Sequence, residues 1–188
     1  TSGGKIAQSN GAPTINPMAW DALGDDDRRV AEADDAGAIV SPDRQYRYCL
    51  WRTWDRAEPT VAFVALNPST ADETQNDNTV TTCERFARDW GYGQLVLGNL
   101  FAYRATDRED LKRARDPVGP RNDEYLRRIV AGADRVVAAW GIDGTFRDRA
   151  SEVVPPLDVE WDALTTTREG HPGHPLRKSA DLEPEPWP

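Results

Sequence analysis

The chain has 188 residues, 38% of them hydrophobic, and its 32 acidic against 23 basic side chains give a formal net charge of -9. This length suits one domain with a substantial core, and no apolar run approaches the roughly 20 residues that span a bilayer. The acidic excess argues against a basic face for nucleic acid, and two cysteines are too few for a disulfide framework or a Cys-rich zinc site. Because the sequence shows no segment of the secretory type, we expect a cytoplasmic protein without a membrane partner.

The basic residues are unevenly divided between lysine and arginine. Only Lys5, Lys112 and Lys178 are lysines, and all the others are arginines. An acidic, lysine-poor composition is typical of a halophilic protein, whose carboxylates hold water and ions in high salt; an acidic protein of an ordinary environment is the alternative. Because strong salt screens charges over about 3 Å, the net charge would then describe the solvent more than the ligand.

The first 43 residues show little apolar periodicity. We expect residues 1–17 to be a disordered leader or a remnant of expression, and residues 18–43 to be an acidic lead-in with one short helix. A single α/β domain is expected over residues 44–178, followed by a proline-rich tail at residues 179–188.

The domain is expected to begin with a hairpin. Residues 46–54 alternate in the two-residue period of a strand, and residues 55–59 have the composition of a turn. Residues 60–66 (TVAFVAL) form a short apolar run that is typical of a buried strand. This pattern predicts two strands that lead into the centre of a sheet.

A helix and a strand are predicted next. Asp77 can cap a helix in which Val80, Cys83 and Phe86 recur at helical spacing. Residues 94–100 (QLVLGNL) then give a second buried strand.

Two further units of helix and strand follow. Pro120 suits the first turn of a helix, which precedes a strand at residues 135–140, and a helix over residues 145–154 precedes a last strand at residues 159–165. Short apolar strands that alternate with helices predict an α/β fold, a three-layer αβα sandwich with a mostly parallel central sheet.

Polar or conformationally special residues follow all four predicted parallel strands. In such sheets ligands bind at the carboxyl ends of the strands. Each motif alone could be structural, as a turn, a loop contact or a packing residue, but four at one edge predict a binding site. The candidate residues are Asn67, Pro68, Ser69 and Thr70, then Asn99, then Trp140, and finally His171 and His174.

The two histidines are the only ones in the chain and lie three residues apart. Pro172 and Gly173 between them make a helical metal pair improbable, and no third ligand is nearby in sequence. We therefore expect no metal and no cofactor, and a rigid loop that presents one imidazole as a hydrogen-bond donor.

The ordered segments resemble known families. ALNPSTADETQNDNTV, GNLFAYRATD, AAWG and GHPGHPL closely resemble a family of bacterial, archaeal and phage proteins, domain-of-unknown-function family 1643, over about residues 46–176. More distantly, they resemble the uracil-DNA glycosylase superfamily. This second resemblance implies a uracil-DNA glycosylase-like fold that recognises a nucleobase in a nucleotide or nucleic acid and hydrolyses an N-glycosidic bond.

The same resemblance implies roles for individual residues. Asn67 would orient the attacking water, Asn99 would read the edge of a base, and His171 would face a carbonyl oxygen of the leaving base. Phe101 or Tyr103 would supply an aromatic face to the base. Because an amide accepts a proton poorly, a nearby carboxylate, Asp72 or Asp77, could act as the general base. The remaining binding residues would be Pro68, Ser69, Thr70, Trp140 and His174.

Two other functions remain open. A non-catalytic module that binds a nucleotide or single-stranded nucleic acid is favoured by the amide at position 67 and by the absence, in the histidine loop, of the serine with which the superfamily grips DNA. A phosphate-handling enzyme could use Ser69, Thr70 and Asp77 with Mg²⁺, although no P-loop is present. A phosphate-bearing ligand is expected if the pocket mouth is lined by Arg104, Arg108, Arg177 and Lys178.

Overall fold

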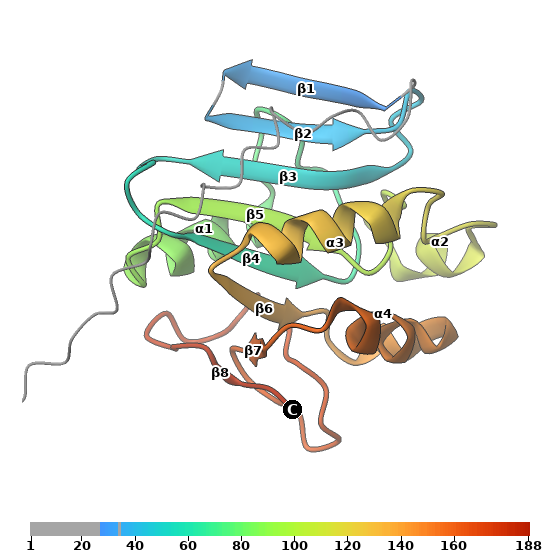
Figure 1. The fold of residues 1–188 in the computed structure, drawn as a ribbon. Coiled ribbons are helices and arrows are strands. Elements are labelled where there is room, and N and C mark those ends of the chain that lie inside the picture. The colour runs from blue at the N-terminus through green and yellow to red at the C-terminus, as the bar shows by residue number, and fades with distance from the viewer. Residues whose placement is uncertain (1–26, 34) are drawn as a thin grey trace, which may run out of the picture.

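The computed structural model describes residues 27–33 and 35–188. Within these ranges the chain forms one eight-stranded sheet with helices on both faces (Figure 1). The strands are β1 (Arg28–Ala33), β2 (Ala36–Val40), β3 (Arg47–Thr53), β4 (Thr60–Ala65), β5 (Gln94–Asn99), β6 (Arg135–Ala139), β7 (Trp161–Ala163) and β8 (Glu185–Pro186). The helical segments are α1 (Asn78–Asp89), α2 (Arg108–Arg113), α3 (Asn122–Gly132), the 3₁₀ segment η2 (Ile142–Asp148) and α4 (Arg149–Leu157). None of these helices combines the length and the apolar character needed to cross a bilayer.

The sheet is mixed, so the expectation of a mostly parallel sheet is wrong for its edges. The strand order is β1-β2-β3-β5-β4-β6-β7-β8. Only the central strands β5, β4, β6 and β7 run parallel, while β1, β2 and β3 on one side and β8 on the other pair antiparallel. For β1, β2 and β3 the reason lies in the connections, since short turns join β1 to β2 and β2 to β3, whereas parallel pairing needs a long crossover. The expected hairpin of residues 46–66 does not form, because β5 pairs with β3 and separates it from β4.

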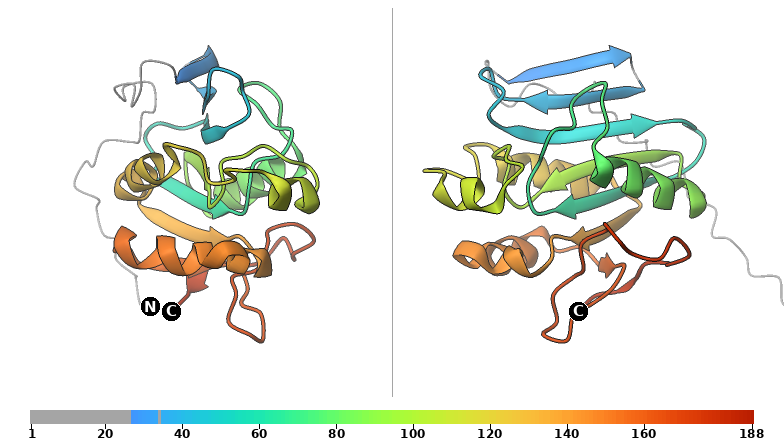
Figure 2. Two further views of the ribbon diagram at one scale, coloured as in Figure 1. Left: turned by 90° about the vertical axis from the view of Figure 1, so that its right-hand side faces the viewer. Right: turned by 180° about the vertical axis from the view of Figure 1, so that it is seen from behind.

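The central strand β4 is buried on both faces, as its unbroken apolar sequence predicts. Phe63 packs with Phe86 of α1, whereas Val64 packs with Leu126 of α3. Successive side chains of a strand point to opposite faces, so a strand covered by helices on both sides needs apolar residues at every position. Figure 2 shows α1 and α3 on opposite sides of the sheet.

The N-terminus of α1 lies where the sequence predicts it. Asp77 is the N-cap, and its Oδ1 accepts a hydrogen bond from the backbone N–H of Val80 at 2.9 Å. Val80, Cys83 and Phe86 are buried on one face of the helix, so the predicted periodicity is confirmed.

Both flanks of the expected domain contribute to the sheet. Part of the region expected to be an acidic lead-in with a helix forms β1 and β2, while residues 1–26 lie outside the described residues. In the expected proline-rich tail, β8 pairs with β7, and Trp187 donates its backbone N–H to the carbonyl of Trp161 at 2.7 Å. Strand pairing through backbone groups does not need the large apolar side chains on which the sequence reading relied.

The order of the parallel strands creates a crevice at the carboxyl end of β4. From β4 the chain passes through α1 to β5 on one side, and from β5 it returns through α3 to β6 on the other side of β4. The connections on the two sides of β4 therefore cover opposite faces. In sheets of this kind the carboxyl ends of the strands diverge at such a reversal, and ligands bind there.

Buried side chains cap the end of β5. Asn122 of α3 donates from Nδ2 to the carbonyls of Asn99 and Leu100 at 2.9 and 3.0 Å. Arg149 of α4 is 2% exposed and donates from Nε to the same Leu100 carbonyl at 2.8 Å. Its other nitrogens pair with Asp123 of α3 and with Glu152. Arg149 thus joins both helices to the strand end beside the crevice.

We expect Arg149→Ala to lower the free energy of unfolding by about 2–3 kcal/mol. The variant loses the bond to the Leu100 carbonyl and the ion pair to Asp123, and it leaves a void at a fully buried position. Urea denaturation followed by circular dichroism measures the change. Arg127→Ala, at an exposed position of α3, is the matched control and should change stability by less than about 0.5 kcal/mol. Equal losses in both variants would contradict the structural role of Arg149.

Candidate functional site

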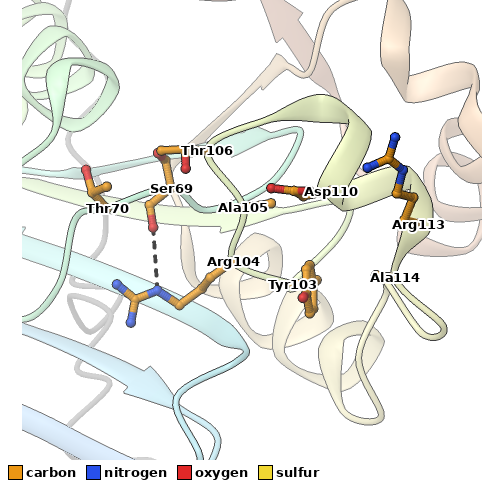
Figure 3. A pocket seen from close by; sticks show the side chains of 9 residues that line it. All are labelled: Ser69, Thr70, Tyr103, Arg104, Ala105, Thr106, Asp110, Arg113 and Ala114. Atoms are coloured by element: carbon orange, nitrogen blue, oxygen red, sulfur yellow. Dashed lines mark hydrogen bonds between the residues drawn. The ribbon is translucent and has the colours of Figure 1, made fainter.

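Two neighbouring cavities open at the carboxyl ends of the parallel strands. We call the larger one, of about 480 Å³, the switch-point cavity, and the smaller one, of about 370 Å³, the loop cavity. The switch-point cavity is lined by Leu66, Asn67, Ser69, Thr79, Ala105, Thr106, Arg108, Trp140, Gly141, Ile142, Asp143, His174, Leu176 and Arg177. The loop cavity, drawn in Figure 3, is lined by Ser69, Thr70, Tyr103, Arg104, Ala105, Thr106, Asp110, Arg113 and Ala114.

A shared wall separates the two cavities. Ser69, Ala105 and Thr106 line both of them. The wall is held by two hydrogen bonds between the loops after β4 and β5: Asn67 Nδ2 donates to the Ala105 carbonyl at 2.8 Å, and the Ala105 N–H donates to the Pro68 carbonyl at 3.0 Å. A ligand with two chemically different parts can therefore lie on both sides of one rigid partition.

Asn67 lines the switch-point cavity, and its side-chain amide is held by hydrogen bonds. Its Nδ2 donates to the carbonyls of Pro68 and Ala105, while its Oδ1 accepts no hydrogen bond from the described residues. The amide is thereby held in one orientation. A carbonyl oxygen in this position can hold a water molecule or an N–H group, but it cannot remove a proton.

The next residues of the same loop are divided between the cavities. Pro68 is buried in the wall, Ser69 lines both cavities, and Thr70 lines only the loop cavity. Figure 3 shows Arg104 next to this loop, where its Nε makes a long hydrogen bond of 3.5 Å to the Ser69 carbonyl.

His174 brings a neutral imidazole to the switch-point cavity. Its Nδ1 accepts the backbone N–H of Leu176 at 3.2 Å, so the neutral ring carries its proton on Nε2. Burial lowers the pKa of His174 below the ordinary range, the positive charges of Arg108 and Lys178 lower it further, and Asp77 opposes the shift. The ring is therefore an uncharged donor at neutral pH.

His171 lies outside both cavities. Its backbone N–H and carbonyl are bonded to the Thr167 side chain and the Thr167 N–H, in a turn closed by the bridge between Thr166 and Pro172. The Pro172 carbonyl accepts the N–H of Gly141 at 2.8 Å. These contacts close the loop, which brings His174 and not His171 to the lining of the cavity.

Among the candidates Asn99, Phe101 and Trp140 at the ends of β5 and β6, only Trp140 lines the switch-point cavity. Trp140 is 2% exposed and packs edge-on against Trp161 and Trp187. Phe101 is 0% exposed and packs against Phe146, so it offers no face to a ligand.

Asn99 does not reach either cavity. It is 1% exposed, and its side-chain amide has no hydrogen-bond partner among the described residues. Asn99 pairs with Ala65 inside the sheet, two residues before Asn67 reaches the cavity along β4. The expectation that Asn99 reads a base fails because the register places it too far back in the sheet.

The two carboxylates expected as general bases both accept hydrogen bonds from backbone N–H groups. Asp77 caps α1 and also accepts the N–H of Ala71 at 3.3 Å, and Asp72 Oδ1 accepts the N–H groups of Thr74 and Gln75. Neither residue lines a cavity.

Sequence reasoning missed the carboxylate that does line the switch-point cavity. Asp143 follows Trp140 and Gly141 in η2, and it pairs with Arg108 at 2.8 Å and with Lys112 at 3.8 Å. A search of the first three residues after each predicted strand would have found it. Among the described residues, no three His, Cys, Asp or Glu side chains gather in a way that could hold a metal ion.

We expect His174 to titrate below the ordinary histidine range. Because burial and the charge of Arg108 are the leading causes of the low pKa of His174, Arg108→Gln should raise this pKa, both by removing a positive charge and by freeing Asp143. NMR titration in a His171→Gln background leaves His174 as the only imidazole signal. Arg115→Gln, an exposed arginine that lines neither cavity, is the control and should leave the titration unchanged. An ordinary pKa for His174 would contradict its burial.

Comparison with known proteins gives a family and no further relative. Residues 47–176 match the model of the family described as Protein of unknown function (DUF1643). The search of curated proteins and the search of solved structures found no match. The matched segment includes every residue that lines the two cavities except Arg177. The match covers more than half of the chain and confirms the resemblance to domain-of-unknown-function family 1643, so the chain belongs to the DUF1643 family.

Proposed function

We propose that this chain is a hydrolase of the uracil-DNA glycosylase type, an αβα domain that recognises a nucleobase in a nucleotide or nucleic acid and cleaves its N-glycosidic bond. One observation carries the proposal: the free Oδ1 of Asn67 and the imidazole of His174 line the same cavity at the reversal of strand order. A base would pack there against the apolar side chains of Leu66, Trp140 and Ile142.

The chemistry needs three contributions that the lining residues can supply. Asn67 Oδ1 would hold a water that attacks the sugar carbon while the bond to the base breaks and its electron pair leaves with the base. The Nε2–H of His174 would donate to the base oxygen on which negative charge develops. Asp143 would take the proton that the attacking water releases, and the departing base would be protonated from solvent.

The electrostatic environment supports a neutral His174 in this role. A donor aimed at developing negative charge acts without having to give up its proton, and a fixed orientation avoids reorganisation during the reaction. The bond from the Leu176 N–H to Nδ1 supplies that orientation.

The amino-acid composition adds a proposal about the environment in which the protein works. An acidic chain with only three lysines leads us to propose a salty cytoplasm as the working environment, so activity should be assayed over a range of potassium chloride concentrations.

We expect His174→Ala to reduce base release by about 10²–10³-fold, the usual effect of removing one donor to a developing anion. Asn67→Ala should also reduce it, because the water loses its acceptor. The assay is chromatographic detection of free base from uracil-containing and modified-base nucleotides and oligonucleotides. His171→Ala is the matched control, since this histidine lines neither cavity, and should retain full activity. Base release that His174→Ala and Asn67→Ala leave unchanged would exclude the catalytic proposal.

A second function is favoured by a separate observation. The amide of Asn67 cannot accept a proton, and the cavity carboxylate Asp143 is held by Arg108 and Lys112. A module that binds a nucleotide or single-stranded nucleic acid without chemistry would have such a site.

Asp143→Asn distinguishes the two functions. For a hydrolase, we expect the rate of base release to fall while ligand affinity changes little, because the proton acceptor is lost. For a binding module, nucleotides should raise the melting temperature of the wild-type protein, with no product after long incubation. Absence of any nucleotide effect on the melting temperature and absence of product would exclude both functions.

A further inference from the structure

The loop cavity lies directly beside the proposed base site but differs from it in chemistry. The two cavities share the wall formed by Ser69, Ala105 and Thr106. The switch-point cavity contains large apolar side chains, whereas the loop cavity contains none beyond the ring of Tyr103. A ligand that crosses the wall would therefore pass from a site with large apolar side chains into one without them.

Hydrogen-bond donors dominate the loop cavity. Ser69, Thr70 and Thr106 contribute hydroxyl groups, and Arg104 and Arg113 contribute guanidinium groups. The only carboxylate in the lining is that of Asp110. In Figure 3 Arg104 and Arg113 lie at opposite ends of the lining with Asp110 between them, and their guanidinium groups do not point toward each other.

Neither arginine has a carboxylate partner within 4.0 Å among the described residues. Arg104 reaches only the backbone carbonyls of Ser69 and Ala71, both at 3.5 Å. By contrast, Arg108 and Lys112 of the same helix as Arg113 pair with Asp143. In a chain with a net charge of -9, two cavity-lining arginines without carboxylate partners leave room for an anion.

A third guanidinium adds to the positive charge behind this wall. Arg47 is buried and donates from one nitrogen to the Ala71 carbonyl at 2.8 Å, the same carbonyl that Arg104 reaches. Burial lowers the pKa of Arg47 to about 10, Arg104 contributes to the lowering, and Asp77 opposes it. An anion in the loop cavity would offset this concentration of like charge.

We propose that the loop cavity binds a phosphate group attached to the nucleoside whose base occupies the switch-point cavity. This inference rests on the proposed function and adds to it the place where the phosphate of the nucleotide or nucleic acid binds, so that the phosphate contributes to substrate recognition. The positive charges of Arg104 and Arg113 attract the phosphate from the two ends of the cavity, and Ser69 and Thr106 lie on the wall between phosphate and base. Guanidinium groups suit this ligand because their planar donors match phosphate oxygens.

Two variants of α2 test the charge of the cavity in opposite directions. Arg113→Gln removes a positive charge and should weaken binding of a nucleoside monophosphate on the order of tenfold. Asp110→Asn removes the opposing negative charge and should strengthen it. Structural damage would weaken binding in both variants, so opposite signs identify an electrostatic contact with the phosphate.

The measurement is isothermal titration calorimetry of the full chain with dUMP and the four common deoxynucleoside monophosphates, each beside its own nucleoside. Arg104→Gln should reproduce the effect of Arg113→Gln, and Arg115→Gln, which lines neither cavity, is the control. We expect each nucleotide to bind more tightly than its nucleoside, and this difference should shrink as salt rises. A uracil-containing oligonucleotide is titrated as well, to distinguish a phosphate monoester from a diester as the natural ligand. If the oligonucleotide binds more tightly than dUMP and Arg113→Gln removes this advantage, the ligand is a diester.

The outcomes separate this inference from the proposed function. If nucleosides and nucleotides bind equally well and Arg113→Gln changes neither, the phosphate site is excluded while base recognition stands. If no nucleoside binds, but inorganic phosphate binds and Arg113→Gln weakens it, the phosphate site stands and base recognition is excluded. Weaker binding of nucleotides in both Asp110→Asn and Arg113→Gln would also overturn the phosphate site.

Discussion

The hydrogen bonds between Asn67, Pro68 and Ala105 are the constraint on which the candidate site depends. They tie the loop after β4 to the loop after β5. Asn67 and Ala105, which make one of these contacts, are 38 residues apart in the sequence. The partition they form is a wall of both cavities, and the same bonds fix the orientation of the Asn67 amide. One small group of contacts therefore sets the geometry of the proposed base site and of the proposed phosphate site.

The sheet supplies the frame for that partition. Its parallel centre places the ends of β4, β5 and β6 at one edge, and the reversal of strand order at β4 leaves space there. The side chains of Asn122 and Arg149 donate to the buried carbonyls of Asn99 and Leu100 at the end of β5. Unpaired carbonyls in a buried position would destabilise the fold, so these contacts keep the edge rigid enough to hold a ligand.

The sequence indicated the edge of the sheet at which the two cavities lie, but only some of its candidate residues line them. Asn67, Ser69 and Trp140 were found because they directly follow apolar strands. Asn99 was chosen by the same rule, and Phe101 through the resemblance to glycosylases, but neither lines a cavity, since neither source contains information about how far neighbouring strands are offset. The sequence reasoning chose His171 over His174 to face the base, but His174 lines the cavity, because the turn that carries both is closed by contacts with Thr165–Thr167 that no local pattern reveals.

The sequence by itself determined the central strands, the helical faces and the cap at Asp77, because apolar periodicity and capping act between residues close in the chain. Only the tertiary structure decided that β1, β2 and β8 extend the sheet, and that His174 and the carboxylate of Asp143 line the switch-point cavity. These features depend on backbone pairing and strand register between distant segments. Such contacts leave no periodic signal in the sequence, so the fold must be formed before they can be recognised.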